Sequence, residues 1–177
     1  MKDLVSMAKR GSKEAFLELV ELRLNVLYKI AYTYMRCSDD SSDIVQDSVL
    51  LAYKNIKKLK DHTKFNPWIT SILVNRCREV LRRSKKVRYE EYTEKTIAPD
   101  TPGIDGYTNL ENSIDIMNSL QKLDEKYREV ITLKYFGDYT LNEISGILDI
   151  PLGTVKSRLN FGLGKLRLDM EVRADEM

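Results

Sequence analysis

Apolar residues in the first half of the chain recur every three or four positions, in stretches that are separated by short polar segments. This period is typical of amphipathic α-helices and not of strands. We interpret Ser38–Ser42 as a turn with helix-capping residues and Lys60–Lys64 as a polar loop. Asn66 and Pro67 fit the N-cap and first position of a helix. The predicted helices are Ser12–Met35, Ser42–Leu59 and Pro67–Arg83.

Composition changes at Ser84, and the stretch that follows contains two prolines, two glycines and scattered charges without helical periodicity. Such a composition favours a flexible linker over residues 84–111. The helical period resumes at Ile114 and continues to Phe136, with Gly137 as the expected C-terminal cap. The sequence therefore predicts an all-α protein with two small helical domains, residues 1–83 and 112–177.

The last part of this second domain has the pattern of a helix-turn-helix. Thr140 and Glu143 have capping-box spacing, and the helix after them carries Ile144 and Ile147 inward. Asp149 and Ile150 supply a turn, and a second helix is expected to begin at Pro151. That helix is predicted to bury two residues, Val155 and Leu159, and to present Lys156, Ser157, Arg158 and Asn160 outward.

Charge is distributed unevenly along the chain. Residues 1–83 hold 16 basic and 10 acidic side chains, a net of +6, although the whole chain has a net charge of only +2. Residues 154–167 hold four basic side chains and no acidic one. A helix that enters the major groove needs long donors and no carboxylate facing the backbone phosphates. The same basic face on an ordinary helical hairpin would simply be solvated, so charge alone does not decide.

Other function classes lack their usual residues. Cys37 and Cys77 are 40 positions apart, which suits neither a disulfide framework nor a zinc site. Paired carboxylates, Cys/His clusters and phosphate-binding glycine loops are not evident, so no catalytic residue, metal or cofactor is predicted. The first residues have no apolar segment of the secretory type, and no run of about 18 apolar residues could span a bilayer. We expect a cytoplasmic protein.

Three motifs together resemble a known family. Asp43-Ile-Val-Gln-Asp47, followed by Leu51-Ala-Tyr53, is similar to a helix of bacterial sigma factors. Pro67-Trp-Ile and Asn75-Arg76 resemble the helix that follows it, and Ile150–Leu159 resembles a sigma-factor recognition segment. Their order and spacing resemble the extracytoplasmic-function (ECF, group IV) branch of the sigma-70 family, which retains only the second and fourth sigma domains.

The resemblance implies a function and partners. It implies an alternative sigma factor that binds core RNA polymerase through the β′ clamp and β flap and recognises promoter DNA. It also implies an anti-sigma factor that could hold the chain at the membrane. The residues implied to bind core polymerase are Asp43, Ile44, Gln46 and Asp47. Those implied to bind the −10 element are His62, Lys64, Asn75, Arg76 and Arg78. Those implied to bind the −35 element lie within Leu141–Asn160 and just beyond it, and they are Thr154, Lys156, Ser157, Arg158, Asn160 and Phe161.

The sequence departs from the family pattern in the helix-turn-helix. Asp149 stands where a glycine is usual, and Asp tolerates left-handed geometry better than most residues. Phe161 stands where many relatives have Arg, and it could contact a thymine methyl or pack inward. Gly162 and Gly164 each cost the helix roughly 1 kcal/mol relative to Ala, so its end is expected to fray without partners.

Two other function classes stay open from the residues alone. One is a conventional helix-turn-helix regulator whose N-terminal helices dimerise, and the other is a helical interaction protein that binds no DNA. The Asp43–Tyr53 motif disfavours the former, and the acid-free recognition helix disfavours the latter.

Overall fold

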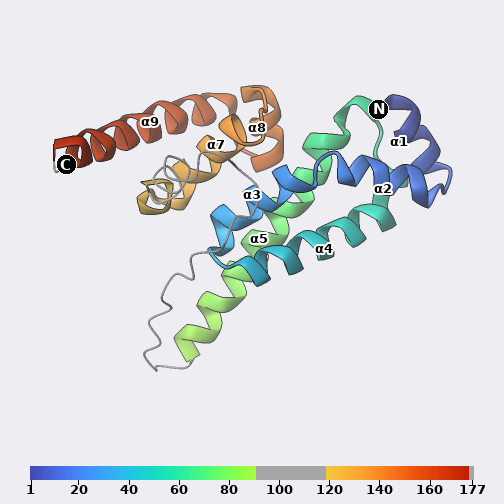
Figure 1. The fold of residues 1–177 in the computed structure, drawn as a ribbon, viewed down its shortest axis with the longest axis horizontal. Coiled ribbons are helices and arrows are strands. Elements are labelled where there is room, and N and C mark those ends of the chain that lie inside the picture. Colours follow the sequence, from blue (N-terminus) through green and yellow to red (C-terminus); the bar gives the residue numbers. More distant parts are fainter. Residues whose placement is uncertain (91–118, 176–177) are drawn as a thin grey trace. The chain divides into compact units, whose positions relative to one another are not determined.

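The computed structural model describes residues 1–90 and 119–175 of the chain, with side chains over 1–84 and 119–169. The chain forms two compact units, Met1–Asp100 and Thr101–Met177. All regular elements in the described ranges are helices, which confirms the predicted all-α class (Figure 1). Among those residues, no helix combines the length and apolar character that a membrane crossing requires.

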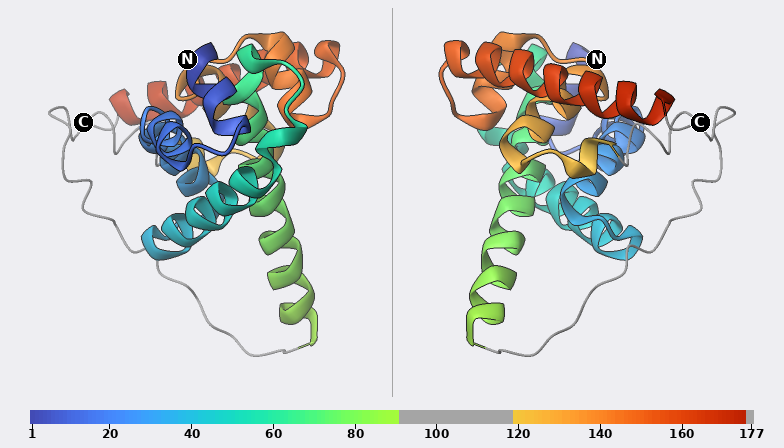
Figure 2. Two further views of the ribbon diagram at one scale, coloured as in Figure 1. Left: turned by 90° about the vertical axis from the view of Figure 1, so that its right-hand side faces the viewer. Right: turned by 90° about the vertical axis from the view of Figure 1, so that its left-hand side faces the viewer.

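Unit 1 is a bundle of helices that share a buried apolar core. Phe16, Leu27, Ile30, Phe65 and Leu73 are almost fully buried there. The C-terminal part of α5 extends beyond the other helices of this unit (Figures 1 and 2). The elements are α1 (Lys2–Lys9), α2 (Lys13–Glu21), α3 (Leu24–Met35), α4 (Ser38–Asn55), the 3-10 turns Ile56–Lys58 and His62–Lys64, and α5 (Phe65–Glu90).

The first predicted helix is in fact two helices. Ser12 caps the start as expected, since its Oγ accepts from the Ala15 amide at 3.2 Å. However, the chain leaves helical geometry between α2 and α3, where Leu22 is well exposed and Arg23 has φ −119°. The prediction of one continuous helix was wrong because the apolar period carries on through the break. A further helix, α1, precedes them and buries Val5 and Ala8.

The boundaries of α4 and α5 also differ from the prediction. Helix α4 begins at Ser38, so the predicted turn is its first turn. That turn contains Asp39 and Asp40, and negative charge is favourable at the N-terminus of a helix. Helix α5 begins at Phe65, and Pro67 is tolerated because the first four amides of a helix need no intrahelical partner. Residues 84–90 are helical and not linker, and the rest of the predicted linker lies outside the described residues.

Unit 2 contains helical residues 119–122, then α7 (Glu125–Tyr135), α8 (Leu141–Leu148) and α9 (Leu152–Asp175). The helix predicted from Ile114 to Phe136 is therefore interrupted at residues 123–124, and its first residues lie outside the described range. Arg128 stabilises the interruption by donating to the carbonyl oxygen of Leu123 at 3.1 Å. The apolar period again continues through the break, so the sequence pattern alone does not indicate it.

At two positions of unit 2, a glycine is required because neighbouring atoms leave no room for a Cβ. A Cβ on Gly137 would lie 2.5 Å from the Tyr139 ring, and the left-handed residue after α7 is Asp138, with φ +55°. The C-cap residue is Phe136, and Gly137 follows it directly, with its amide donating to the Thr132 carbonyl oxygen at 3.2 Å. A Cβ on Gly162 would lie 2.8 Å from Ile131 Cδ1, so this glycine lets α9 approach α7 closely. Helix α9 continues past Gly162 and Gly164 to Asp175.

Candidate nucleic-acid interface

The turn between α8 and α9 is fixed by interactions that are local in sequence. Thr140 and Glu143 form the predicted capping box, with the Thr140 amide donating to Glu143 Oε2 at 3.0 Å and the Glu143 amide donating to Thr140 Oγ1 at 3.3 Å. Asp149 adopts the left-handed conformation, with φ +54° and ψ +50°. Ser145 Oγ closes the turn by donating to the Ile150 carbonyl oxygen at 2.6 Å. The predicted helix-turn-helix is confirmed.

Three predicted DNA-contact residues are exposed on the first turns of α9. Lys156, Ser157 and Asn160 point to solvent, while Val155 beneath them is fully buried. Thr154 is half-buried, and its carbonyl oxygen accepts from Ser157 Oγ at 3.1 Å. This surface can offer an ammonium, a hydroxyl and an amide to base edges or phosphates.

Two other predicted contact residues lie against α7. Arg158 is half-buried, and its Nη1 is 3.4 Å from Oε1 of the buried Glu129. The Phe161 ring packs on Tyr127 with centroids 4.7 Å apart and stays 53% exposed. Arg158 was predicted to point outward, because Glu129 is 29 residues away and helix periodicity carries no information about this pairing.

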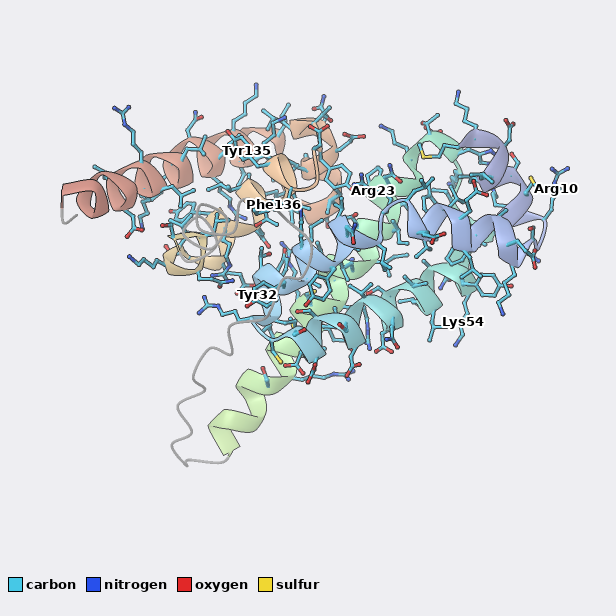
Figure 3. All side chains as sticks on the ribbon, in the orientation of Figure 1. Arg10, Arg23, Tyr32, Lys54, Tyr135 and Phe136 are labelled. Atoms are coloured by element: carbon cyan, nitrogen blue, oxygen red, sulfur yellow. The ribbon has the colours of Figure 1, made fainter. Side chains whose placement is uncertain are left out.

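The exposed face of α4 carries most of the residues predicted to bind core polymerase. Asp43, Gln46 and Asp47 are exposed at helical spacing, whereas Ile44 is buried and belongs to the core. Sequence analysis missed Leu50, which continues this face and is 58% exposed. An apolar residue at the end of a polar stripe is the signal that could have found it. Lys54 marks the end of α4, where it points away from the bundle (Figure 3).

Residues predicted for two different partners contact each other in unit 1. Arg76 of α5 donates to Asp47 of α4 at 2.8 Å and to Glu79 at 2.7 Å, and Arg83 also pairs with Glu79. The bond to Asp47, followed by that to Glu79, raises the pKa of the Arg76 guanidinium above its ordinary value. The same guanidinium lowers the pKa of the Glu79 carboxyl. Since Asp47 is 56% exposed, this pair contributes little stability and leaves Asp47 reachable by a partner.

The loop predicted to read the −10 element is attached to α1. His62 Nδ1 is 3.0 Å from Ser6 Oγ, and its Nε2 is 3.4 Å from Lys9 Nζ. Lys9 also donates to the Leu59 carbonyl oxygen at 2.6 Å. Lys64 is exposed on the same loop, near the start of α5.

The other predicted −10 residues lie further along α5. Asn75 is exposed and Arg78 is half-buried. They follow the start of α5 by ten or more residues, which corresponds to roughly 15 Å or more along the helix. The −10 residues thus form two groups, one on the loop and one on α5 near α4.

Comparisons with known proteins agree over both units. The family model described as Sigma-70 region 2 matches residues 19–87, and the one described as Sigma-70, region 4, matches residues 113–166. The ECF RNA polymerase sigma factor SigW of Bacillus subtilis is 30% identical over 181 residues, covering 94% of this chain and 95% of SigW. The RNA polymerase sigma factor SigV of the same organism is 29% identical over 143 residues, covering 81% and 83%.

Two solved structures have a similar fold at 22% identity. One is CnrH in complex with the cytosolic domain of CnrY, with a TM-score of 0.72 over 97% of each chain. The other is the sigma factor RpoE in complex with the anti-sigma factor NepR from Bartonella quintana, with a TM-score of 0.76 over 89% of this chain and 97% of that one.

Proposed function

This chain belongs to the ECF family of RNA polymerase sigma factors, and from that premise we propose how its parts perform the work of an alternative sigma factor. We assign core-polymerase binding to the exposed face of α4, −10 recognition to α5 and the 60–64 loop, and −35 recognition to α8 and α9. The helical unit that the sequence alone could have assigned to dimerisation is the one that matches sigma region 2.

The observation that carries this assignment is the exposed face of α4. Asp43, Gln46 and Asp47 present hydrogen-bonding groups, and Leu50 adds an exposed apolar side chain beside them. A surface with an apolar anchor and a polar surround is typical of protein partners. On the other unit, the exposed part of α9 from Thr154 to Arg167 contains no carboxylate that would repel DNA phosphates.

Several finer assignments rest on the family alone. Region 4 is expected to contact the polymerase β flap, and the chain is expected to act in the cytoplasm as an initiation factor without catalysis of its own. The two similar structures were solved with bound partners, one of them named an anti-sigma factor. We propose that an anti-sigma factor binds this chain too and could hold it at the membrane.

The test separates the polymerase contact of Asp47 from its ion pair. Asp47→Ala removes both, whereas Arg76→Met breaks the ion pair and keeps the Asp47 carboxylate. If α4 binds the polymerase, Asp47→Ala weakens binding of the purified chain to core enzyme, and Arg76→Met does not. Arg76→Met should instead reduce promoter opening by the assembled holoenzyme.

Affinity for core enzyme is measured by pull-down and titration, and promoter opening by transcription in vitro on a genomic fragment library. Asp43→Ala offers a second change on the same face, without any change to the Arg76 pair. Unchanged core affinity in both the Asp43 and the Asp47 variants would refute the assignment of α4.

A further inference from the structure

We propose that Glu129 and Tyr127 of α7 are positioning residues that fix the rotation of the recognition helix α9 about its own axis. In this proposal Arg158 and Phe161 contact these two residues and do not contact the DNA. Base and phosphate contacts then fall to Lys156, Ser157 and Asn160. This inference rests on the proposed −35 recognition by α9 and makes it specific.

The geometry of α9 separates its side chains into two groups. Successive residues of an α-helix are rotated by about 100°. Lys156, Asn160 and Ser157 therefore lie within an arc of about 100°, and all three are exposed. Arg158 points about 150° away from the middle of that arc, towards α7. A single helix cannot present both Asn160 and Arg158 squarely to one groove.

The inward direction of Arg158 is explained by the buried carboxylate of Glu129. The Glu129 side chain is only 5% exposed, and a buried carboxylate is costly unless a cation or hydrogen-bond donor compensates it. Arg158 Nη1 lies 3.4 Å from Glu129 Oε1. Because this guanidinium is already balanced by a carboxylate, it adds little net positive charge to the DNA-facing surface. Its role is to connect the recognition helix to the helix behind it.

Tyr127 forms a second connection one turn further along α9. Its ring packs on Phe161, and Lys165 Nζ lies 5.2 Å from the Phe161 ring centroid and 5.5 Å from that of Tyr127. At the next residue, Gly162 lets the two helices approach, since a Cβ there would be 3.2 Å from Tyr127 Cβ. Contacts at 158, 161 and 162 thus fix α9 at three neighbouring points on one flank.

The inference predicts different salt dependences for the two groups. A lost phosphate contact lowers the slope of log affinity against log salt concentration by about one unit. Lys156→Met should do this on any DNA. Arg158→Met and Glu129→Gln should leave the slope unchanged and reduce discrimination between the correct and an altered −35 element, by about tenfold. The double variant should be no worse than either single variant, because both break the same contact.

The experiment uses holoenzyme assembled from the full chain and core polymerase. Its probes are a promoter fragment selected by this holoenzyme from a genomic library and the same fragment with a scrambled −35 element. Binding is measured at several salt concentrations, and thermal melts confirm that each variant folds. If Glu129→Gln does not fold, Tyr127→Leu tests the same inference through the Phe161 contact.

The outcomes distinguish the positioning role of α7 from the assignment of −35 recognition to α9. A loss of about one unit of salt slope in Arg158→Met, with unchanged discrimination in Glu129→Gln or Tyr127→Leu, would overturn the positioning role. If Lys156→Met also leaves binding and slope unchanged, the assignment of −35 recognition to α9 fails as well. Reduced discrimination at constant slope supports the positioning role.

Discussion

Gly162 and Gly164 lie two residues apart on α9 but should respond oppositely to the same substitution. A Cβ on Gly164 would meet nothing within 4 Å, whereas a Cβ on Gly162 would lie 2.8 Å from Ile131 Cδ1 and 3.2 Å from Tyr127 Cβ. Carbon atoms in good contact are about 3.5–4.0 Å apart. Gly162→Ala must therefore displace Ile131, which is buried in the core of unit 2 with Leu120 and Leu123.

The expected magnitudes follow from two opposing terms. Replacing Gly by Ala in a helix interior contributes about 1 kcal/mol of stability, which Gly164→Ala should gain in full. Overpacking a well-filled core costs about 1–3 kcal/mol, so Gly162→Ala should be destabilised by about 1 kcal/mol after the helix term is included. The gap of about 2 kcal/mol between the variants corresponds to roughly 10 °C in the melting temperature of a unit of this size.

Thermal unfolding of the full chain measures this gap. Circular dichroism follows the helices of both units, while the fluorescence of Trp68, the only tryptophan, follows unit 1 and serves as an internal control. The Trp68 transition should be the same in both variants. Equal stabilisation by Gly162→Ala and Gly164→Ala would show that α7 and α9 are not in close contact at Gly162.

Other predictions concern a cap, a turn and a buried thiol. Thr140→Ala should destabilise unit 2 by about 1 kcal/mol in urea titrations, and Thr140→Ser should recover most of the loss. Asp149→Gly should preserve the left-handed turn and stability, whereas Asp149→Val should lower the melting temperature, since β-branched residues disfavour positive φ. Burial raises the pKa of the Cys77 thiol to about 12, so at pH 8 iodoacetamide should label the half-buried Cys37 first, as mass spectrometry can show. The pKa of the Cys77 thiol in the unfolded chain is about 8.5, so the contribution of this thiol to stability should decline as the pH rises from there towards 12.

The sequence predicts the helix-turn-helix well because its signals are close together along the chain. Thr140 and Glu143 are three residues apart, and the left-handed turn depends on the backbone preference of Asp149 itself. The helix breaks at residues 22–23 and 123–124 were missed for the converse reason. The residues on both sides of each break bury into one core, so the apolar period is uninterrupted.

The candidate sites were predicted in part, because exposure follows helix periodicity but pairing does not. Lys156, Ser157 and Asn160 are exposed as their spacing on α9 indicates. Asp47, which pairs with Arg76, and Glu129, which pairs with Arg158, each lie 29 residues from their partner, a distance over which periodicity carries no information. A basic residue in a promising position can thus be either a free donor or one side of an internal ion pair.

The attachment of α1 to the 59–62 segment bears on how much of the chain must be produced for biochemical work. The match to sigma region 2 begins only at residue 19, after α1. A protein shortened to that match would lose Ser6 and Lys9, and with them the hydrogen bonds to His62 and to the Leu59 carbonyl oxygen. It would also lose Val5, Ala8 and Phe16, which are buried in the structure. Truncation at the limits of the matched regions is therefore a change to the loop to which we assign −10 recognition, and the N-terminal eighteen residues belong in any preparation used to test that assignment.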